Sequence, residues 1–338
     1  MKNLLMSAAI GALLLATDAA QADPAQLTKP TYGSYGFDEK GMDPAVKPGD
    51  DFYLHANGGW AKATPIPADK SNYGAFNVLD DLSRERTKGI LGEARKDSTS
   101  RIGIAYASYL DAPTVETKGL TPIKPWLAKI AAVKDKTGYA RLAAEAARAG
   151  ISGPFTLYVG QDDKAPDTYI LNLRQSGLGL PDRDFYLQPD EKMAAIRTAY
   201  IAHLEQMLTL AGASDAKARA AALMAFETEI AKVHWTQVAS RDADKTYNRM
   251  TLADLKKAAP GFDFTAYFAA NRLKPQALIV AQPTAITGEA ALIARTPIGV
   301  LKDALLLRSL HSYADYLPDR IADADFAFYG TTLSGTPQ

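Results

Sequence analysis

The chain contains no cysteine in its 338 residues. This absence excludes disulfide bonds, thiol nucleophiles and every metal site that needs a thiolate ligand. The 38 basic and 38 acidic side chains balance, so no net charge would attract nucleic acid or an anionic membrane. We therefore expect no nucleic-acid partner and a fold that is stabilised by packing, for which an apolar content of 47% is sufficient.

Several catalytic signatures are also missing. The sequence has no Gly-x-Ser-x-Gly elbow, no Gly-Lys-Ser/Thr phosphate loop and no His-Glu-x-x-His helix. Of the four histidines, no two lie within one helical turn of each other; they are His55, His203, His234 and His311. We interpret His203 and His234 as core or boundary residues because each adjoins an apolar helix face. The sequence therefore predicts no catalytic and no metal-ligating residue in this chain.

Neighbouring carboxylates are the remaining candidates for chemistry. They are Asp50-Asp51, Asp80-Asp81, Asp162-Asp163 and Asp182 with Asp184. A glycosidase would need two such groups facing each other across a cleft, which adjacency does not establish. We interpret them as turn formers and helix caps, and Asp184 with Arg183 as a structural ion pair.

The N-terminus has the three parts of a secretory signal peptide. Lys2 precedes an apolar run over residues 4–16, and Ala20-Gln21-Ala22 is a small-x-small cleavage site. A membrane anchor is the alternative, but the run is shorter than the ~20 apolar residues that span a bilayer. We predict a signal peptide over residues 1–22, cleavage after Ala22, a periplasmic or secreted protein, and no membrane anchor after cleavage.

Hydrophobic spacing predicts a mainly α fold with a small β-hairpin. Apolar residues recur at helical spacing over residues 193–208 and 223–233, which predicts two packed amphipathic helices. Residues 154–159 and 168–173 read as the two strands of a hairpin. The end of the chain, from residue 330, reads as a turn with nothing to pack behind it.

Residues 42–76 combine glycine and proline with several aromatic rings. Four prolines and four glycines argue against a helix, and the rings argue against a flexible linker. We predict an ordered, irregular segment that lies across another element or lines a cleft.

This stretch resembles the start of the neprilysin-like zinc metallopeptidases, the M13 family. The matching residues are Asp51-Phe52-Tyr53, Asn57-Gly58-Gly59-Trp60, Ile66-Pro67, Ser71, Tyr73-Gly74 and Phe76. Three later stretches are similar to family segments: Gly179-Leu180-Pro181-Asp182-Arg183-Asp184-Phe185-Tyr186, Tyr247-Asn248-Arg249-Met250-Thr251-Leu252, and Phe328-Tyr329-Gly330 with Leu333-Ser334-Gly335. The likeness extends over essentially the whole mature chain.

The resemblance implies the N-terminal part of a two-domain metallopeptidase. Residues 23–76 would be a strap that contacts the catalytic domain, and residues 77–338 an incomplete helical lid domain. The family's zinc, the His-Glu-x-x-His helix and a third, Glu ligand would belong to a C-terminal half that these residues do not contain. The implied partners are that half, in the same or a separate chain, and peptide substrates; the chain alone would be inactive and bind no zinc.

Two residues are implied to face the substrate. Phe76 matches a family aromatic that lines the pocket for the residue after the scissile bond, although it could equally be the first core residue of its helix. Asn72 stands where neprilysin has an arginine that binds the substrate's C-terminal carboxylate. Because Asn lacks that charge, the resemblance favours endopeptidase action in the complete enzyme.

A second hypothesis is a non-catalytic helical peptide-binding module of the periplasm. An unrelated helical periplasmic protein is a third, which the four matching segments argue against.

Overall fold

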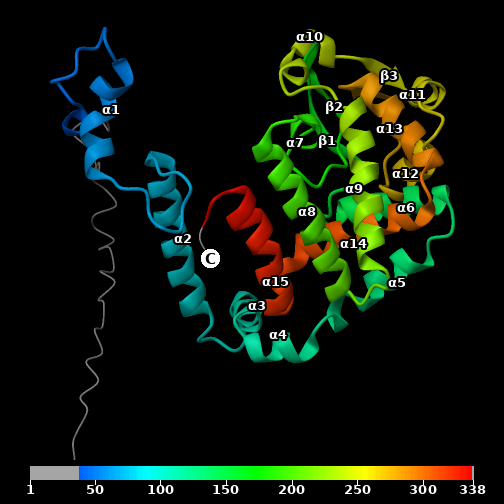
Figure 1. Ribbon diagram of the computed structural model, residues 1–338, viewed down its shortest axis with the longest axis horizontal. Helices are drawn as coiled ribbons and strands as arrows, with labels where there is room; N and C mark the ends of the chain where they lie inside the picture. The colour runs from blue at the N-terminus through cyan, green and yellow to red at the C-terminus, as the bar shows by residue number, and fades with distance from the viewer. Residues whose placement is uncertain (1–37, 337–338) are drawn as a thin grey trace, which may run out of the picture. The chain divides into compact units, whose positions relative to one another are not determined.

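A computed structural model describes residues 38–336, which fall into two compact units (Figure 1). One unit ends at Ile66 and the other begins at Pro67. The boundary therefore lies inside the stretch 23–76 that we predicted as one strap. The predicted signal peptide, residues 1–22, lies outside the described residues. In the described part of the chain, no helix is both long and apolar enough to cross a membrane.

The first unit is built on a helix that we did not predict. α1 (Phe52–Ala63) occupies the centre of residues 42–76, so the prediction of an irregular segment was wrong there. The Asp51 side chain accepts a hydrogen bond from the Leu54 amide at 2.8 Å and caps the helix. All four prolines of the stretch lie outside α1, so they do not interrupt it.

Two glycines inside α1 have a packing role. A Cβ at Gly59 would lie 2.7 Å from the carbonyl oxygen of Met42, and one at Gly58 would lie 2.8 Å from the Asp43 Cβ. Glycine costs a helix about 1 kcal/mol relative to alanine. Here the absence of a side chain permits close contact with the preceding turn. Asp43 in that turn also forms a 2.6 Å ion pair with Lys62 of the helix.

The second unit is mainly helical, as predicted. Its α-helices are α2 (Ala75–Ala94), α3 (Arg101–Tyr109), α4 (Ala112–Lys118), α5 (Lys124–Ala132), α6 (Lys136–Arg148), α7 (Asp184–Leu187), α8 (Glu191–Leu210), α9 (Ala216–Val233), α10 (Ala243–Thr246), α11 (Leu252–Ala258), α12 (Phe264–Ala270), α13 (Pro283–Arg295), α14 (Ile298–Tyr313) and α15 (Asp319–Phe326). The predicted stripes over residues 193–208 and 223–233 form α8 and α9, which pack against each other.

The predicted hairpin is part of a larger sheet. β1 (Phe155–Asp162) and β2 (Ala165–Gln175) pair antiparallel, with Leu157 opposite Leu173. β4 (Ala277–Val280) joins β2 in parallel, and β3 (Arg249–Thr251) pairs antiparallel with β4. The strand order is β1-β2-β4-β3. We did not predict β3 and β4, because three or four residues are too few to show an alternation of apolar and polar side chains.

The core lies where α8, α9 and α14 meet. Leu204, Met207, Leu223 and Ile230 from the predicted stripes are each at most 2% exposed. Burying one such side chain stabilises the fold by roughly 1.5–3 kcal/mol. A second cluster of rings, from β1 and α12, includes Phe155 and Phe264 with centroids 5.4 Å apart.

The C-terminal stretch corrects another prediction. Residues Ala327–Leu333 form a π-helix, whereas we expected a turn with nothing behind it from residue 330. Phe328 is buried there, and its ring stacks on His203 with the centroids 4.9 Å apart. Residues 337–338 lie outside the described part.

Candidate substrate-facing surface

Residues 67–74 lead into α2 and carry Asn72. Asp81 of α2 binds this segment twice, through Lys70 Nζ at 2.7 Å and the Tyr73 hydroxyl at 3.1 Å. The hydrogen bond from Lys70 lowers the pKa of Asp81 and, in return, raises the pKa of Lys70. Asn77 accepts a hydrogen bond from the Gly74 amide at 2.9 Å and thereby caps α2. The backbone that carries Asn72 is therefore attached to the first two turns of the helix.

The two predicted substrate-facing residues both lie at the surface. Asn72 is exposed, and Phe76 at the start of α2 is 89% exposed. Phe76 is therefore not packed in a core within the described part of the chain. Contact of either residue with a substrate stays a prediction.

α2 has an exposed apolar face. Among the described residues the helix buries none of its 20 side chains, and Ile90 near its other end is 69% exposed. α3 packs against α2 and adds Ile102, Ile104 and Tyr109, which are each at least half exposed. An amphipathic helix of this kind normally buries its apolar stripe against a partner.

A groove of about 530 Å³ opens beside α3. Seven residues line it: Leu91, Arg101, Ile102, Ala105, Tyr106, Tyr109 and Tyr316. Tyr109 and Tyr316 meet edge to face with centroids 5.7 Å apart, so the groove joins α3 to the segment before α15 (Figure 1). Aromatic walls with one cation are typical of sites that bind peptide side chains.

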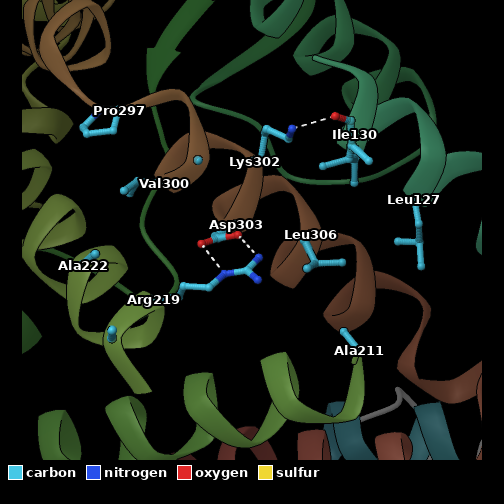
Figure 2. A pocket seen from close by; sticks show the side chains of 13 residues that line it. Leu127, Ile130, Ala211, Arg219, Ala222, Pro297, Val300, Lys302, Asp303 and Leu306 are labelled. Carbon is cyan, nitrogen blue, oxygen red and sulfur yellow. Dashed lines mark hydrogen bonds and ion pairs between the residues drawn. The ribbon is translucent and has the colours of Figure 1, made fainter. Parts of the chain in front are cut away.

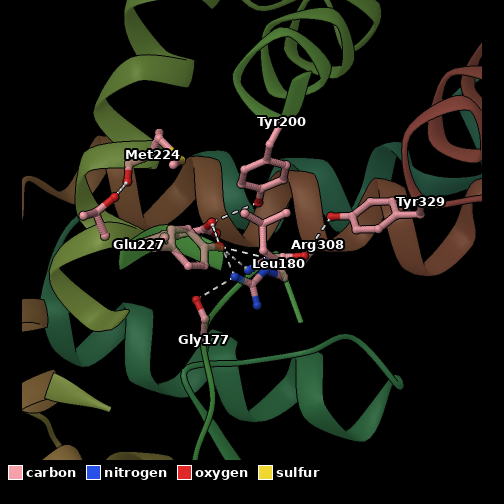
Figure 3. Close-up of polar contacts among 10 residues, drawn as sticks. Gly177, Leu180, Tyr200, Met224, Glu227, Arg308 and Tyr329 are labelled. Carbon is pink, nitrogen blue, oxygen red and sulfur yellow. Dashed lines mark hydrogen bonds and ion pairs between the residues drawn. The ribbon is translucent and has the colours of Figure 1, made fainter. Parts of the chain in front are cut away.

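The segment Gly177–Leu187, which resembles the family motif, is held by a buried ion pair (Figure 3). Arg308 of α14 contacts Glu227 of α9 at 2.9 Å and donates to the carbonyl oxygen of Gly177 at 2.6 Å. Glu227 is 1% exposed and also accepts from the hydroxyls of Tyr186 at 2.7 Å and Tyr200 at 2.9 Å. Every charge in this cluster therefore has a partner.

The electrostatics of this cluster follow from burial. Burial and the nearby Glu227 carboxylate raise the pKa values of Tyr186 and Tyr200 well above the usual range. Burial lowers the pKa of Arg308, but the combined effect of Glu227, Tyr200 and Tyr186 outweighs it, and the net direction is upward. The tyrosines stay neutral donors and the arginine stays charged, so the cluster has a structural role. We did not predict Glu227 or Arg308, because a single charged residue within an apolar stripe carries no signal of its partner.

Glycine is required where this motif crosses α8. A Cβ at Gly179 would lie 1.8 Å from the Tyr200 hydroxyl oxygen. The predicted ion pair between Arg183 and Asp184 is not formed: Arg183 Nε donates to the Ala231 carbonyl oxygen at 3.2 Å. Asp182 accepts from the Asp184 amide at 2.7 Å and from Gln237 at 2.7 Å, so local turn geometry uses this carboxylate.

The other adjacent carboxylates also have structural roles, as interpreted from the sequence. Asp80 pairs with Arg84 at 2.6 Å on the surface of α2. Asp162 accepts from the Tyr247 hydroxyl at 2.7 Å, a bond that lowers the pKa of Asp162. These carboxylates do not face each other across a cleft as a glycosidase pair would.

His203 and His234 are buried, which confirms the interpretation as core residues. Burial lowers the pKa of each to about 4, so both rings are neutral near pH 7. His234 Nε2 lies 3.4 Å from Glu289, a fully buried carboxyl on α13. Burial raises the pKa of Glu289 well above the usual range, so the two groups form a neutral contact.

The described residues do not fit a zinc ion. Residues 38–336 hold no group of three or more His, Asp or Glu side chains arranged to bind a metal. The two orphaned polar atoms of this kind, His203 Nδ1 and Glu289 Oε1, belong to separate core contacts.

A further groove of about 620 Å³ lies between α5, α9 and α14 (Figure 2). Arg219 binds both oxygens of Asp303 there, at 2.5 and 3.0 Å. Its walls are mostly small or apolar residues, such as Ala222 and Val300. The Asp303 carboxylate is thus paired, and Lys302, which also lines the groove, donates to the Ala131 carbonyl oxygen at 2.6 Å.

Comparison with known proteins places these features in a family context. The sequence model of Peptidase family M13 matches residues 48–338. An endothelin-converting enzyme homolog of Locusta migratoria is 32% identical over 244 residues, which are 67% of this chain and 33% of that protein. Endothelin-converting enzyme 1 of Homo sapiens is 26% identical over 318 residues, 88% of this chain and 41% of that protein.

Solved structures show the same relationship. The zinc metalloprotease Zmp1 of Mycobacterium tuberculosis, solved with an inhibitor, is 34% identical with a TM-score of 0.81. The match covers 90% of this chain and 48% of Zmp1. The chain thus spans less than half the length of the relatives that it matches.

Proposed function

This chain belongs to peptidase family M13, and on that premise we propose that it is the N-terminal, substrate-enclosing region of an exported zinc metalloendopeptidase. The substrates are peptides or oligopeptides. In this proposal a C-terminal region supplies the zinc ligands and the base that activates water, because residues 38–336 hold no group that fits a metal ion.

The observation that carries the proposal is the exposed face of α2. A 20-residue helix that buries no side chain, with Phe76 at its first turn, requires a partner surface. We assign that surface to the catalytic region. Phe76 then forms part of the wall for the substrate residue after the scissile bond, at the edge where the two regions meet.

Asn72 indicates which peptides the complete enzyme would cleave. Its carboxamide is neutral and exposed, beside a segment fixed by Asp81 and Lys70. A neutral amide does not select a terminal carboxylate as an arginine fork does. The complete enzyme should therefore cleave within peptides and tolerate a blocked C-terminus.

The first test uses the exported chain purified alone. We expect no hydrolysis of a quenched fluorescent peptide above a blank and no stoichiometric zinc by elemental analysis, because the ligand set is absent. Chelator-sensitive turnover that scales with protein concentration would overturn the proposal. Genomic DNA beyond codon 338 provides a second test, in which we expect a continuation that encodes His-Glu-x-x-His.

The second candidate function is peptide binding without catalysis. The aromatic groove beside α3 favours it, because Tyr106, Tyr109 and Tyr316 could hold apolar side chains. The two functions separate on one measurement. Titration of the purified chain with a peptide should show saturable binding that Tyr109→Ala abolishes for a binding module at this groove, and no Tyr109-dependent binding for an enclosing region that needs its catalytic partner.

A further inference from the structure

The outer edge of β1 has features that the proposed function does not use. β1 is the first strand in the order β1-β2-β4-β3, so only β2 pairs with it. Its opposite edge faces away from the sheet. An edge strand presents a row of backbone donors and acceptors that can pair with another extended chain.

Two hydrogen bonds and the register of the hairpin establish which backbone groups of β1 point outward. The Ala281 amide donates to the Leu173 carbonyl oxygen, which therefore points away from β1. Leu173 is opposite Leu157, so this is a non-hydrogen-bonded pair and the Leu157 backbone groups point outward. The Tyr267 hydroxyl donates to the Phe155 carbonyl oxygen from outside the hairpin, which agrees with this alternation.

By the two-residue period of a strand, Leu157 and Val159 both direct their amide and carbonyl groups outward. In residues 38–336 no group outside the hairpin makes a hydrogen bond to the backbone of either residue. Two donors and two acceptors are thus available along one edge, at the spacing of a β-ladder.

This edge lacks the features that normally prevent strand pairing. Residues 155–161 read Phe-Thr-Leu-Tyr-Val-Gly-Gln, with no charged residue and no proline. Val159 is 61% exposed and Tyr158 is 40% exposed, so apolar side chains flank the open backbone on both faces. Natural edge strands usually carry a lysine, a proline or an early end at such a position.

One charge lies within reach of a strand added here. The Arg174 guanidinium of β2 lies over the Tyr158 ring, 5.4 Å from its centroid, and so extends toward the edge. In the described residues it has no carboxylate within ion-pair distance. A side chain opposite Tyr158 on an added strand would lie on this face, where a carboxylate would meet Arg174.

We propose that the outer edge of β1 binds an extended peptide by strand addition. The peptide pairs its backbone with Leu157 and Val159, places an apolar side chain against Val159, and places an acidic side chain near Arg174. The proposed contacts involve neither α2 nor a metal.

The test measures binding of one labelled peptide to the exported chain. The probe is an N-terminally fluorescein-labelled Thr-Val-Asp-Val-Thr-Val-Ser amide, and its Kd is read by fluorescence anisotropy. We expect saturable binding that weakens about three- to tenfold in Val159→Pro, which removes one outward amide and no bond to β2. Val159→Thr keeps that amide but makes the side-chain contact less apolar, so it should weaken binding less than Val159→Pro does.

Two further arms keep the test decisive. N-methylation of alternate probe amides should abolish binding in one register and spare it in the other, without any change to the protein. Arg174→Gln should weaken the probe about threefold and leave a probe with Asn for Asp unchanged. No saturable binding, or equal affinity for both N-methylated probes, would overturn the proposal. A dimer by light scattering that Val159→Pro dissociates would also overturn it, because a second copy would then occupy the edge.

Discussion

The Glu227–Arg308 cluster and the exposed α2 face belong to the same unit but differ in how their groups are satisfied. In the cluster each charge has a buried partner and the Gly177 carbonyl has a donor. On α2 the apolar side chains face outward, and its ion pair between Asp80 and Arg84 lies in solvent. The cluster is complete within this chain, whereas α2 buries none of its side chains among the described residues, and we propose that a further surface covers it.

This contrast shows which of the family-like residues are required by the packing of this chain. The motif around Gly179 belongs to the packed interior, so its residue types are fixed by sterics and hydrogen bonds. Asn72 and Phe76, at the end of the other motif, lie at the surface, so the fold of this chain does not require these two side chains. Residues of the second kind indicate function more directly than those of the first.

The largest expected effect comes from breaking the buried pair. Arg308→Met leaves the Glu227 carboxylate without its cation in the core, which should lower the free energy of unfolding by about 3–5 kcal/mol. Urea denaturation of the purified chain measures it. The matched change Arg84→Met removes a solvent-exposed pair and should cost less than about 0.5 kcal/mol. Equal losses for the two variants would remove the distinction between the regions.

Acid should lower the free energy of unfolding through each of the two buried histidines. His203 and His234 have a pKa of about 4 when folded, against about 6.5 when unfolded. Between these values the unfolded chain binds more protons, so stability falls as pH drops from about 6.5 to 4, by roughly 3 kcal/mol for each ring. His203→Phe should remove about half of this slope. A free energy of unfolding that stays constant over that interval would contradict the burial argument.

Gly179→Ala should cost about 1–3 kcal/mol, because the new methyl group overlaps the Tyr200 hydroxyl. The closest overlap is with that oxygen, and the ring carbon Cζ follows at 2.8 Å. In a Tyr200→Phe background the same substitution should cost much less, and a double-mutant cycle of thermal unfolding measures the coupling. Additive losses would show that the motif glycine is not set by Tyr200.

Glu289→Gln should stabilise the chain at pH 7 by about 1–2 kcal/mol. Burial raises the folded pKa of Glu289, so its ionisation opposes folding as pH rises above about 4.3. Glutamine keeps a donor toward His234 Nε2 and has no charge to bury. The difference between variant and parent in urea should shrink toward pH 4. The surface control Glu229→Gln should change stability by less than about 0.5 kcal/mol at either pH.

The smallest effect should come from α2 itself. Leu79, which is mostly exposed, should tolerate Leu79→Lys with less than about 0.5 kcal/mol change in stability. The same variant should reduce self-association of the isolated chain in sedimentation, because it places a charge on the apolar face. A large loss of stability would mean that Leu79 is already packed.

The sequence predicted an element correctly where the hydrophobic period of a helix or a strand extends over enough residues. The stripes of α8 and α9 and the hairpin were each predicted and are each formed. α1 was missed, because glycine content was weighed without the close contact that Gly59 makes with Met42. β3 and β4 were missed because a strand of three or four residues depends on its neighbours and not on its own pattern.

The residues of the candidate site were less predictable from the sequence than the helices and the hairpin were. Phe76 and Asn72 came from resemblance alone, and the structure places both at the surface. Glu227 and Arg308 are 81 residues apart, and no local pattern links residues that meet only through packing of α9 on α14. The open edge of β1 likewise could not be predicted from its composition, because locating it requires the strand order and the register.

Hydrogen–deuterium exchange on the purified chain tests the central contrast most directly. We expect amides of α2 to exchange at least about 10³-fold faster than those of α9 under the same conditions, because α2 packs against α3 but buries none of its side chains. Protection of α2 equal to that of α9 would contradict it, since α2 would then be stable without the partner surface that we assign to it.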